Sequence, residues 1–166
     1  MLQLLCKTRW KVKPHFADAR AEAQDLKALA GLPHEAVLVI GDAALVLAAQ
    51  EVYPYRYDLG EEWKTRTGLP FVFAIWAARR SADADAVGRV HSSLLASREW
   101  GLEHLDDIAL EAATNTAIPA TACREYLGGL DYGLSANHKQ GLGAFLVEAA
   151  YNGLVPDINI ELTLVA

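Results

Sequence analysis

The sequence has 166 residues, of which 52% are hydrophobic, and its formal net charge is −6 at pH 7. This length predicts one domain or two small lobes with enough apolar side chains for a real core. The acidic balance argues against a general binder of nucleic acids or acidic membrane surfaces, because either would need a basic face. No apolar run approaches the ~20 residues that span a bilayer, and no signal-peptide pattern is present, so we expect a soluble, cytoplasmic protein.

The residue types that usually carry metal or nucleophilic chemistry form no recognisable set. Cys6 and Cys123 have neither the number nor the spacing of a disulfide scaffold or a zinc site, and their apolar surroundings predict ordinary buried thiols. No two histidines have the i, i+4 spacing of a metal site on a helix. The chain also lacks a phosphate-binding Walker loop, a G-x-G-x-x-G turn and a G-x-S-x-G elbow. The residues alone therefore predict no metal, no cofactor and no catalytic set.

The first half of the chain alternates short apolar runs with helical patterns. In chain order we expect the end of a helix over Met1–Trp10, a weak strand over Val12–Phe16, a helix from Asp18 to about Ala30, a buried strand over Ala36–Ile40 and a helix over Ala43–Ala49. No capping residue precedes the first helix, which suggests that something once came before Met1.

The junction after the strand at Ala36–Ile40 is a candidate binding loop. Gly41 and Asp42 follow this strand directly, and ligands of open α/β sheets tend to bind beyond the carboxyl ends of strands, where helix N-termini point. A glycine there also allows a ligand close to the backbone. The alternative is that Gly41 only turns the chain and Asp42 only caps a helix, and the spacing alone favours that alternative.

The stretch Leu59–Ala78 is the centre of the predicted fold. It begins as a polar helix that ends at Thr67-Gly68, and Pro70 prevents the helix from continuing. The uncharged, aromatic and β-branched run Phe71–Ala78 then predicts a strand buried on both faces. A short edge-like strand, Tyr55–Tyr57, precedes the helix, and Trp63 is expected to pack against the sheet rather than to bind a ligand.

The second half of the chain is predicted to be helical. We expect helices over Ala82–Ser97 with Ser81 as its cap, over Leu102–Asn115, from Pro119 to Leu127 with Gly128-Gly129 as its end, and from Ser135 to about Asn152-Gly153. Gly141-Leu142-Gly143 lies inside the last helix and is interpreted as a concession to packing rather than as a phosphate-binding loop. The tail alternates Ile158, Ile160, Leu162 and Leu164 with polar residues, like a half-buried strand. The predicted division is an α/β lobe over 1–78 and a helical segment over 79–166.

Three stretches together carry a resemblance to a known family. They are VLVIGDAAL (Val37–Leu45), YDLGEEWKTRTGLPFVFAIWAAR (Tyr57–Arg79) and the closing pattern REYLGGLDYGLSANHKQGLGAFLVEAAYNGLVP. The chain resembles the chorismate dehydratases of the futalosine route to menaquinone over nearly its whole length. The dihydroxynaphthoate synthases of the same route are similar but carry a catalytic histidine where this chain has Gly41, which favours the dehydratase.

The resemblance implies an α/β fold like the type-2 periplasmic binding proteins, with two lobes that close on a ligand. This chain would hold most of the second lobe and C-terminal helices that pack on the first lobe, and it would lack the family's N-terminal part. The implied reaction is the loss of water from chorismate to give 3-[(1-carboxyvinyl)oxy]benzoate, in which the substrate's own carboxylate takes the ring proton. No cofactor, nucleic acid or membrane is implied, and a homodimer stays open.

The residues that the resemblance places around the substrate come from two loops. Gly41, Asp42 and Ala43 would line the cleft with their amide groups, and Pro70, Phe71 and Phe73 would form an apolar wall. No catalytic residue can be assigned. Two alternatives remain, namely a binding protein of the same fold without chemistry, and an incomplete piece that needs the missing part to bind chorismate.

Overall fold

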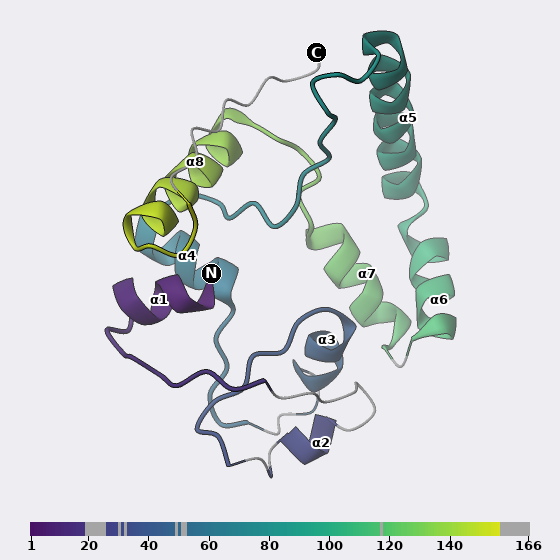
Figure 1. Cartoon of the computed structure of the whole chain (residues 1–166). Coiled ribbons are helices and arrows are strands. Elements are labelled where there is room, and N and C mark those ends of the chain that lie inside the picture. The colour runs from purple at the N-terminus through teal and green to yellow at the C-terminus, as the bar shows by residue number, and fades with distance from the viewer. Residues whose placement is uncertain are drawn as a thin grey trace. The chain divides into compact units, whose positions relative to one another are not determined.

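The computed structural model describes residues 1–18, 26–29, 31, 33–48, 50, 53–116 and 118–156 (Figure 1). The regular elements in these ranges are all α-helices: α1 (Leu2–Thr8), α2 (Leu26–Leu29), α3 (Asp42–Ala48), α4 (Leu59–Thr67), α5 (Ala84–Glu103), α6 (Leu105–Asn115), α7 (Ala120–Gly129) and α8 (Ala136–Tyr151). Across the described ranges, no helix is both long and apolar enough to cross a bilayer.

The chain divides into two compact units, each built from separate stretches of sequence. The first unit contains Met1–His15, Tyr57–Leu94 and the chain from Tyr132 onwards, and the second contains Phe16–Arg56 and Leu95–Asp131. Helices α1, α4 and α8 belong to the first unit, and α3, α6 and α7 to the second. The boundary falls within α5, so this helix contributes to both units.

The first unit is organised around α4. Helix α1 packs against α4 and buries Leu4 and Leu5 completely. An ion pair joins Arg9 Nε to Glu62 Oε2 at 2.9 Å, and Lys7 Nζ donates to the carbonyl oxygen of Asn152 at the end of α8, also at 2.9 Å. The N-terminal helix is thus tied by charge to α4 and to the chain just after α8.

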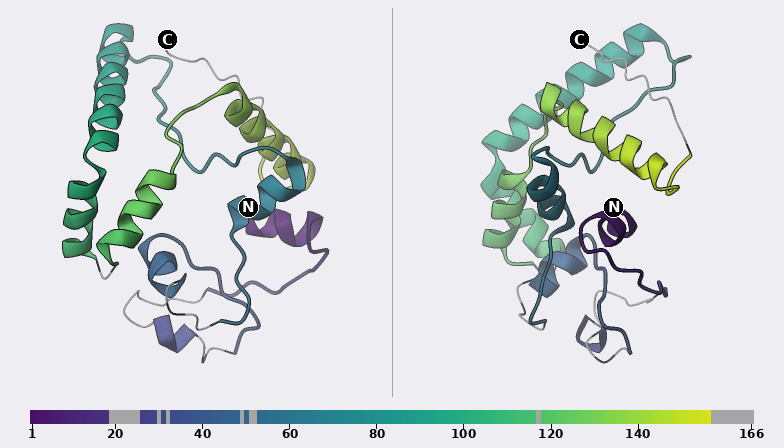
Figure 2. Two further views of the ribbon diagram at one scale, coloured as in Figure 1. Left: turned by 180° about the vertical axis from the view of Figure 1, so that it is seen from behind. Right: turned by 90° about the vertical axis from the view of Figure 1, so that its left-hand side faces the viewer.

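The second unit has a small apolar core between α6 and α7, which lie side by side (Figure 2). Ala109, Ile118 and Cys123 form the buried centre, and Leu45 and Val46 of α3 pack against it. On the exposed side, Arg124 of α7 forms an ion pair with Asp106 of α6. The expectation that Cys6 and Cys123 are buried free thiols is confirmed.

The predicted strands are wrong wherever the structure describes them. Val12–Phe16, Ala36–Ile40, Tyr55–Tyr57 and Phe71–Ala78 contain no β-structure in the described part of the chain. Many of their large side chains are exposed, to 78% for Ile40 and to 85% for Trp76, whereas Phe71 and Val72 are half-buried. A strand needs a second strand for its backbone hydrogen bonds, and the described residues supply none to these runs. The predicted strand in the tail lies outside the described residues, and the two-lobed α/β fold stays a proposal.

Several helix boundaries also differ from the sequence prediction. Helix α5 begins at Ala84 rather than Ala82, because the Asp83 carboxylate accepts the amide N–H of Ala86 at 2.8 Å, and it continues beyond Ser97 to Glu103. Helix α7 includes Gly128-Gly129 instead of ending before them. Of the helix predicted from Asp18 to Ala30, the described part contains only α2.

The helices with clear end signals are where the sequence places them. Ser135 caps α8 by accepting the amide of His138, and α8 ends at Tyr151 before Asn152 and Gly153. Helix α4 ends at Gly68, and α3 occupies the stretch predicted as helical after Gly41.

Candidate functional site

The junction after α4 is the best-defined part of the predicted site. Asp58 caps α4 by accepting the amide N–H of Glu61 at 2.9 Å, and Gly68 ends the helix with a left-handed φ of 72°. The Gly68 amide donates to the carbonyl oxygen of Lys64 at 2.8 Å. Because an L-residue with a Cβ is disfavoured at this φ, glycine is required to release the chain towards Pro70.

The side chain of Thr67 fixes the backbone that leads to Pro70. Its hydroxyl donates to the carbonyl oxygen of Trp63 at 2.8 Å and accepts the amide N–H of Leu69 at 3.1 Å. One hydroxyl therefore connects the last turn of α4 to the residue before Pro70. This arrangement holds Pro70 at a defined place beside the helix end.

An aromatic cluster anchors the apolar residues of the predicted site. Trp63 is completely buried, and its ring meets those of Phe71 and Phe145 edge-on at centroid distances of 6.2 and 5.7 Å. Phe71 also meets Phe145 at 5.0 Å and Phe73 at 4.9 Å. Such edge-to-face pairs add to the free energy gained by burying the rings. Trp63 was expected to pack against a sheet, and its partners are instead the rings of Phe71 and Phe145. The role of Phe71 and Phe73 in a substrate-binding wall stays a prediction.

Two glycines allow close backbone approaches around this cluster. A Cβ at Gly141 in α8 would strike the carbonyl oxygen of Pro70, so α8 and the Pro70 turn fit together only because Gly141 has no side chain. A Cβ at Gly60 in α4 would lie 2.7 Å from Cζ of Phe73. The interpretation of Gly141 and Gly143 as packing positions is therefore confirmed for Gly141 but not for Gly143, where a Cβ would meet nothing within 4 Å.

Arg66 is a neighbour of this cluster that the sequence reasoning missed. Its guanidinium lies 5.0 Å from the ring centroid of Trp63, and its Nη2 is 2.6 Å from Glu148 Oε2 in α8. Both side chains of the ion pair are about three-quarters buried. The i, i+3 spacing of Trp63 and Arg66 was the available signal, because it places both on one face of a helix.

The second predicted loop, Gly41–Ala43, lies in the other unit. Gly41 has a φ of 67°, and its carbonyl oxygen accepts the amides of Ala44 and Leu45 at 2.9 and 3.4 Å. Asp42 is the first residue of α3, and both Gly41 and Asp42 are exposed. The predicted turn is confirmed here. The Gly41–Ala43 loop belongs to the second unit, and the Pro70–Phe73 segment belongs to the first.

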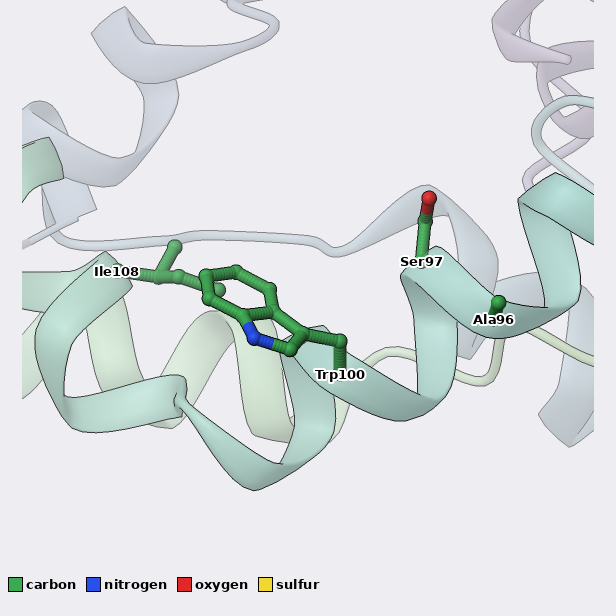
Figure 3. A pocket seen from close by; sticks show the side chains of 5 residues that line it. Ala96, Ser97, Trp100 and Ile108 are labelled. Carbon is green, nitrogen blue, oxygen red and sulfur yellow. The ribbon is translucent and has the colours of Figure 1, made fainter.

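A hollow outside the predicted site opens between α5 and α6, within the second unit (Figure 3). It has a volume of about 550 Å³ and is lined by Ala96, Ser97, Trp100, Gly101 and Ile108. The Trp100 ring stacks on His104 at 4.3 Å, and the His104 ring nitrogen lies 2.7 Å from the Trp100 carbonyl oxygen. The lining offers one hydroxyl and no charge, so it favours apolar contact alone.

Among the residues that the structure describes, the Cys6 thiol in α1 is the one side chain with a clear change in acidity. Burial raises the pKa of the Cys6 thiol above its ordinary value, so this thiol stays protonated and unreactive at neutral pH. Within the described ranges, no group of three or more histidine, cysteine or acidic side chains could hold a metal ion.

Comparison with known proteins places these features in a family. The model of a family described as menaquinone biosynthesis matches residues 1–151. The chain is also 31% identical, over 127 residues, to a chorismate dehydratase from Thermus thermophilus, an alignment that covers 68% of this chain and 46% of that protein. This chain thus spans about half the length of the curated relative. Since the family model matches most of its residues, the chain belongs to the menaquinone biosynthesis family.

Proposed function

We propose that this chain is the part of a chorismate dehydratase that contains the substrate-binding junction after α4. The observation that carries the proposal is the 31% identity to the Thermus thermophilus chorismate dehydratase over 68% of this chain. In the complete protein we expect a two-lobed α/β fold like that of the type-2 periplasmic binding proteins. The reaction removes water from chorismate and leaves 3-[(1-carboxyvinyl)oxy]benzoate.

The apolar wall of the proposed site is the Pro70–Phe73 segment. Its position is supported by the Thr67 hydroxyl on one side and by the rings of Trp63 and Phe145 on the other. A wall fixed in this way can hold a ring in one orientation without having to be ordered by the substrate, and such preorganisation favours both binding and catalysis.

In the second unit, we propose the Gly41–Ala43 loop as a binding element of its own. Gly41 has no Cβ, and a Cβ added there would meet nothing within 4 Å, so the backbone is open to a ligand. Exposed amide N–H groups of this loop are suitable donors for a carboxylate of chorismate. The Asp42 carboxylate has to point away from the substrate, because chorismate is itself a dianion and like charges repel.

The proposed reaction does not require a side chain that acts as a general base. Loss of the hydroxyl group and one ring proton as water makes the ring aromatic, so the reaction is strongly downhill. In the proposed mechanism the enolpyruvyl carboxylate of the substrate takes the ring proton. The protein then has to hold both carboxylates, keep the leaving hydroxyl in line and exclude bulk water.

Calorimetric titration of chorismate into this chain and into its Gly41→Trp variant tests the site. We expect the parent chain to bind chorismate and the variant to bind it at least about tenfold more weakly, a change of about 1.4 kcal/mol. Because Gly41 has a left-handed φ of 67°, any residue with a Cβ is strained there, so the helical circular dichroism of the variant has to match that of the parent chain before the affinities are compared. Equal affinity of the two proteins would remove the Gly41 loop from the site, and no binding by either would contradict a substrate site in this chain. Binding without any turnover would favour a binding protein without chemistry.

A further inference from the structure

One face of α8 contacts the elements that carry the proposed apolar wall. Gly141, Phe145 and Glu148 have the i, i+4, i+7 spacing that places residues on one side of a helix. Gly141 fits against the carbonyl group of Pro70, and the Phe145 ring meets that of Phe71 at 5.0 Å. The third residue, Glu148, forms an ion pair with α4. This side of α8 therefore determines how the helix sits against the Pro70 turn and α4.

The three contacts differ in how strictly they fix α8. Edge-to-face ring pairs are favourable over centroid distances of about 4.5–7 Å, so the contact of Phe145 tolerates a small shift. The contact at Gly141 is steric and limits only how closely α8 approaches the turn. The bond between Arg66 Nη2 and Glu148 Oε2 is charge-assisted and, at 2.6 Å, short. The two side chains are only 23% and 25% exposed, and an unpaired charge there would be costly, so the ion pair is the contact that sets the position of α8 along its axis.

Arg66 can serve as a fixed anchor because it is itself held in place. Its guanidinium lies 5.0 Å from the ring centroid of Trp63, which is completely buried, and such a cation–π contact favours one placement of the charge. The Nε of Arg66 is buried without a hydrogen-bond partner among the described residues. Because buried polar groups are usually paired, this guanidinium depends all the more on the carboxylate of Glu148.

A shift of α8 would reach the wall through Phe145. Its ring meets those of Trp63 and Phe71 at 5.7 and 5.0 Å, and Phe71 in turn meets Phe73 at 4.9 Å. Phe73 is 76% exposed, so the position of its ring depends strongly on Phe71. Packed side chains transmit a displacement because they leave few voids to absorb it. The ion pair thus acts on the wall without touching it.

We propose that Arg66 and Glu148 are positioning residues for the substrate wall. Their ion pair holds α8 in the position along its axis that places the rings of Phe71 and Phe73 for binding. The substrate part of this inference rests on the proposed function. The coupling between the ion pair and the two rings needs no substrate and is measured separately.

Nuclear magnetic resonance of the chain labelled with ¹³C-phenylalanine tests this coupling. The sequence contains four phenylalanines, and Phe16, which belongs to the second unit, is the internal reference. Glu148→Gln removes a charge with little change in shape, and Glu61→Gln removes the same charge at an exposed residue of α4. We expect Glu148→Gln to shift the ring signals of Phe71 and Phe73, and Glu61→Gln to leave them in place. An ion pair that only stabilised the fold would not move the signals of the folded chain.

A second variant and a titration complete the test. Arg66→Lys keeps the positive charge but not the planar guanidinium, so it should shift the same signals in the same direction by less. Circular dichroism reports whether each variant is folded. In calorimetric titration, Glu148→Gln should bind chorismate about threefold or more weakly than the parent chain, because a misplaced wall is no longer preorganised, and Glu61→Gln should bind it equally.

Ring signals of Phe71 and Phe73 that stay in place in folded Glu148→Gln would overturn the proposal, and so would equal shifts in Glu61→Gln. If Glu148→Gln does not fold, unshifted signals in Arg66→Lys overturn it. Shifted rings with an unchanged affinity for chorismate would overturn the role in substrate binding. No binding by the parent chain would contradict the proposed function instead, and the ring signals alone would then decide whether the ion pair positions the rings.

Discussion

The close contact between α8 and the Pro70 turn makes Gly141→Ala the most informative single substitution. Gly141 is buried within α8, and a Cβ there would overlap the carbonyl oxygen of Pro70 and lie 3.3 Å from its carbonyl carbon and 3.6 Å from Cβ of Leu69. The obstruction is backbone, which cannot rotate away like the end of a long side chain. The substitution therefore forces α8 away from the turn that positions Phe71.

Two opposing terms decide the size of the effect. Alanine in place of glycine inside a helix is favourable by about 1 kcal/mol. Forcing one extra methyl group into a packed contact typically costs about 1–3 kcal/mol, and a clash with backbone belongs at the upper end of that range. We therefore expect a net loss of about 1–2 kcal/mol in the free energy of unfolding for Gly141→Ala.

The same helix contains a matched control. A Cβ at Gly143 would meet nothing within 4 Å, so Gly143→Ala should cause no clash. The higher helix propensity of alanine should then raise the free energy of unfolding by about 0.5–1 kcal/mol. Urea unfolding followed by far-ultraviolet circular dichroism measures both free energies of unfolding. If both substitutions stabilise the chain equally, the proposed contact between Gly141 and Pro70 does not exist in solution.

Three further predictions concern the first unit. Trp63→Ala should lower the free energy of unfolding by about 3–5 kcal/mol, because Trp63 is completely buried. Tyr151→Ala, at a residue that is 90% exposed, should change it by less than about 0.5 kcal/mol. Similar losses in the two variants would contradict the burial of Trp63 in the aromatic cluster. Glu148→Gln should lower the free energy of unfolding by about 1 kcal/mol, because it weakens the ion pair with Arg66. A double-mutant cycle with Arg66→Met that shows no coupling energy would contradict this ion pair. Burial raises the pKa of the Cys6 thiol, so the unfolded chain binds fewer protons than the folded chain above the ordinary thiol pKa of about 8.5. The free energy of unfolding should therefore fall as the pH rises beyond that value, and it should fall less steeply with pH in Cys6→Ala. Identical pH slopes in the two proteins would contradict the raised pKa.

The sequence predicted well what is determined locally. Ser135 accepts an amide hydrogen at the start of α8, and Gly68 ends α4 in a left-handed conformation. Both signals are contained in a few neighbouring residues. The Gly41 turn belongs to the same class. Local signals suffice there because a helix makes its hydrogen bonds within its own segment.

What depends on distant partners could not be predicted in this way. The runs that end at Ile40 and Ala78 have strand composition, but β-structure also requires a neighbouring strand, and none is present among the described residues. The contact of Gly141 with Pro70 and the ion pair of Arg66 with Glu148 likewise join residues far apart in the sequence. Gly141 had a sequence signal, a glycine inside a helical pattern, and Arg66 had its i, i+3 spacing from Trp63, but neither signal pointed to the distant partner.

The measurement that tests the proposed function most directly is incubation of this chain with chorismate, followed by liquid chromatography with ultraviolet and mass detection. We expect an aromatic product lighter than chorismate by one molecule of water, formed faster than in a control without protein and more slowly with the Gly41→Trp variant. Chorismate that stays unchanged relative to the control would contradict dehydratase activity in this chain.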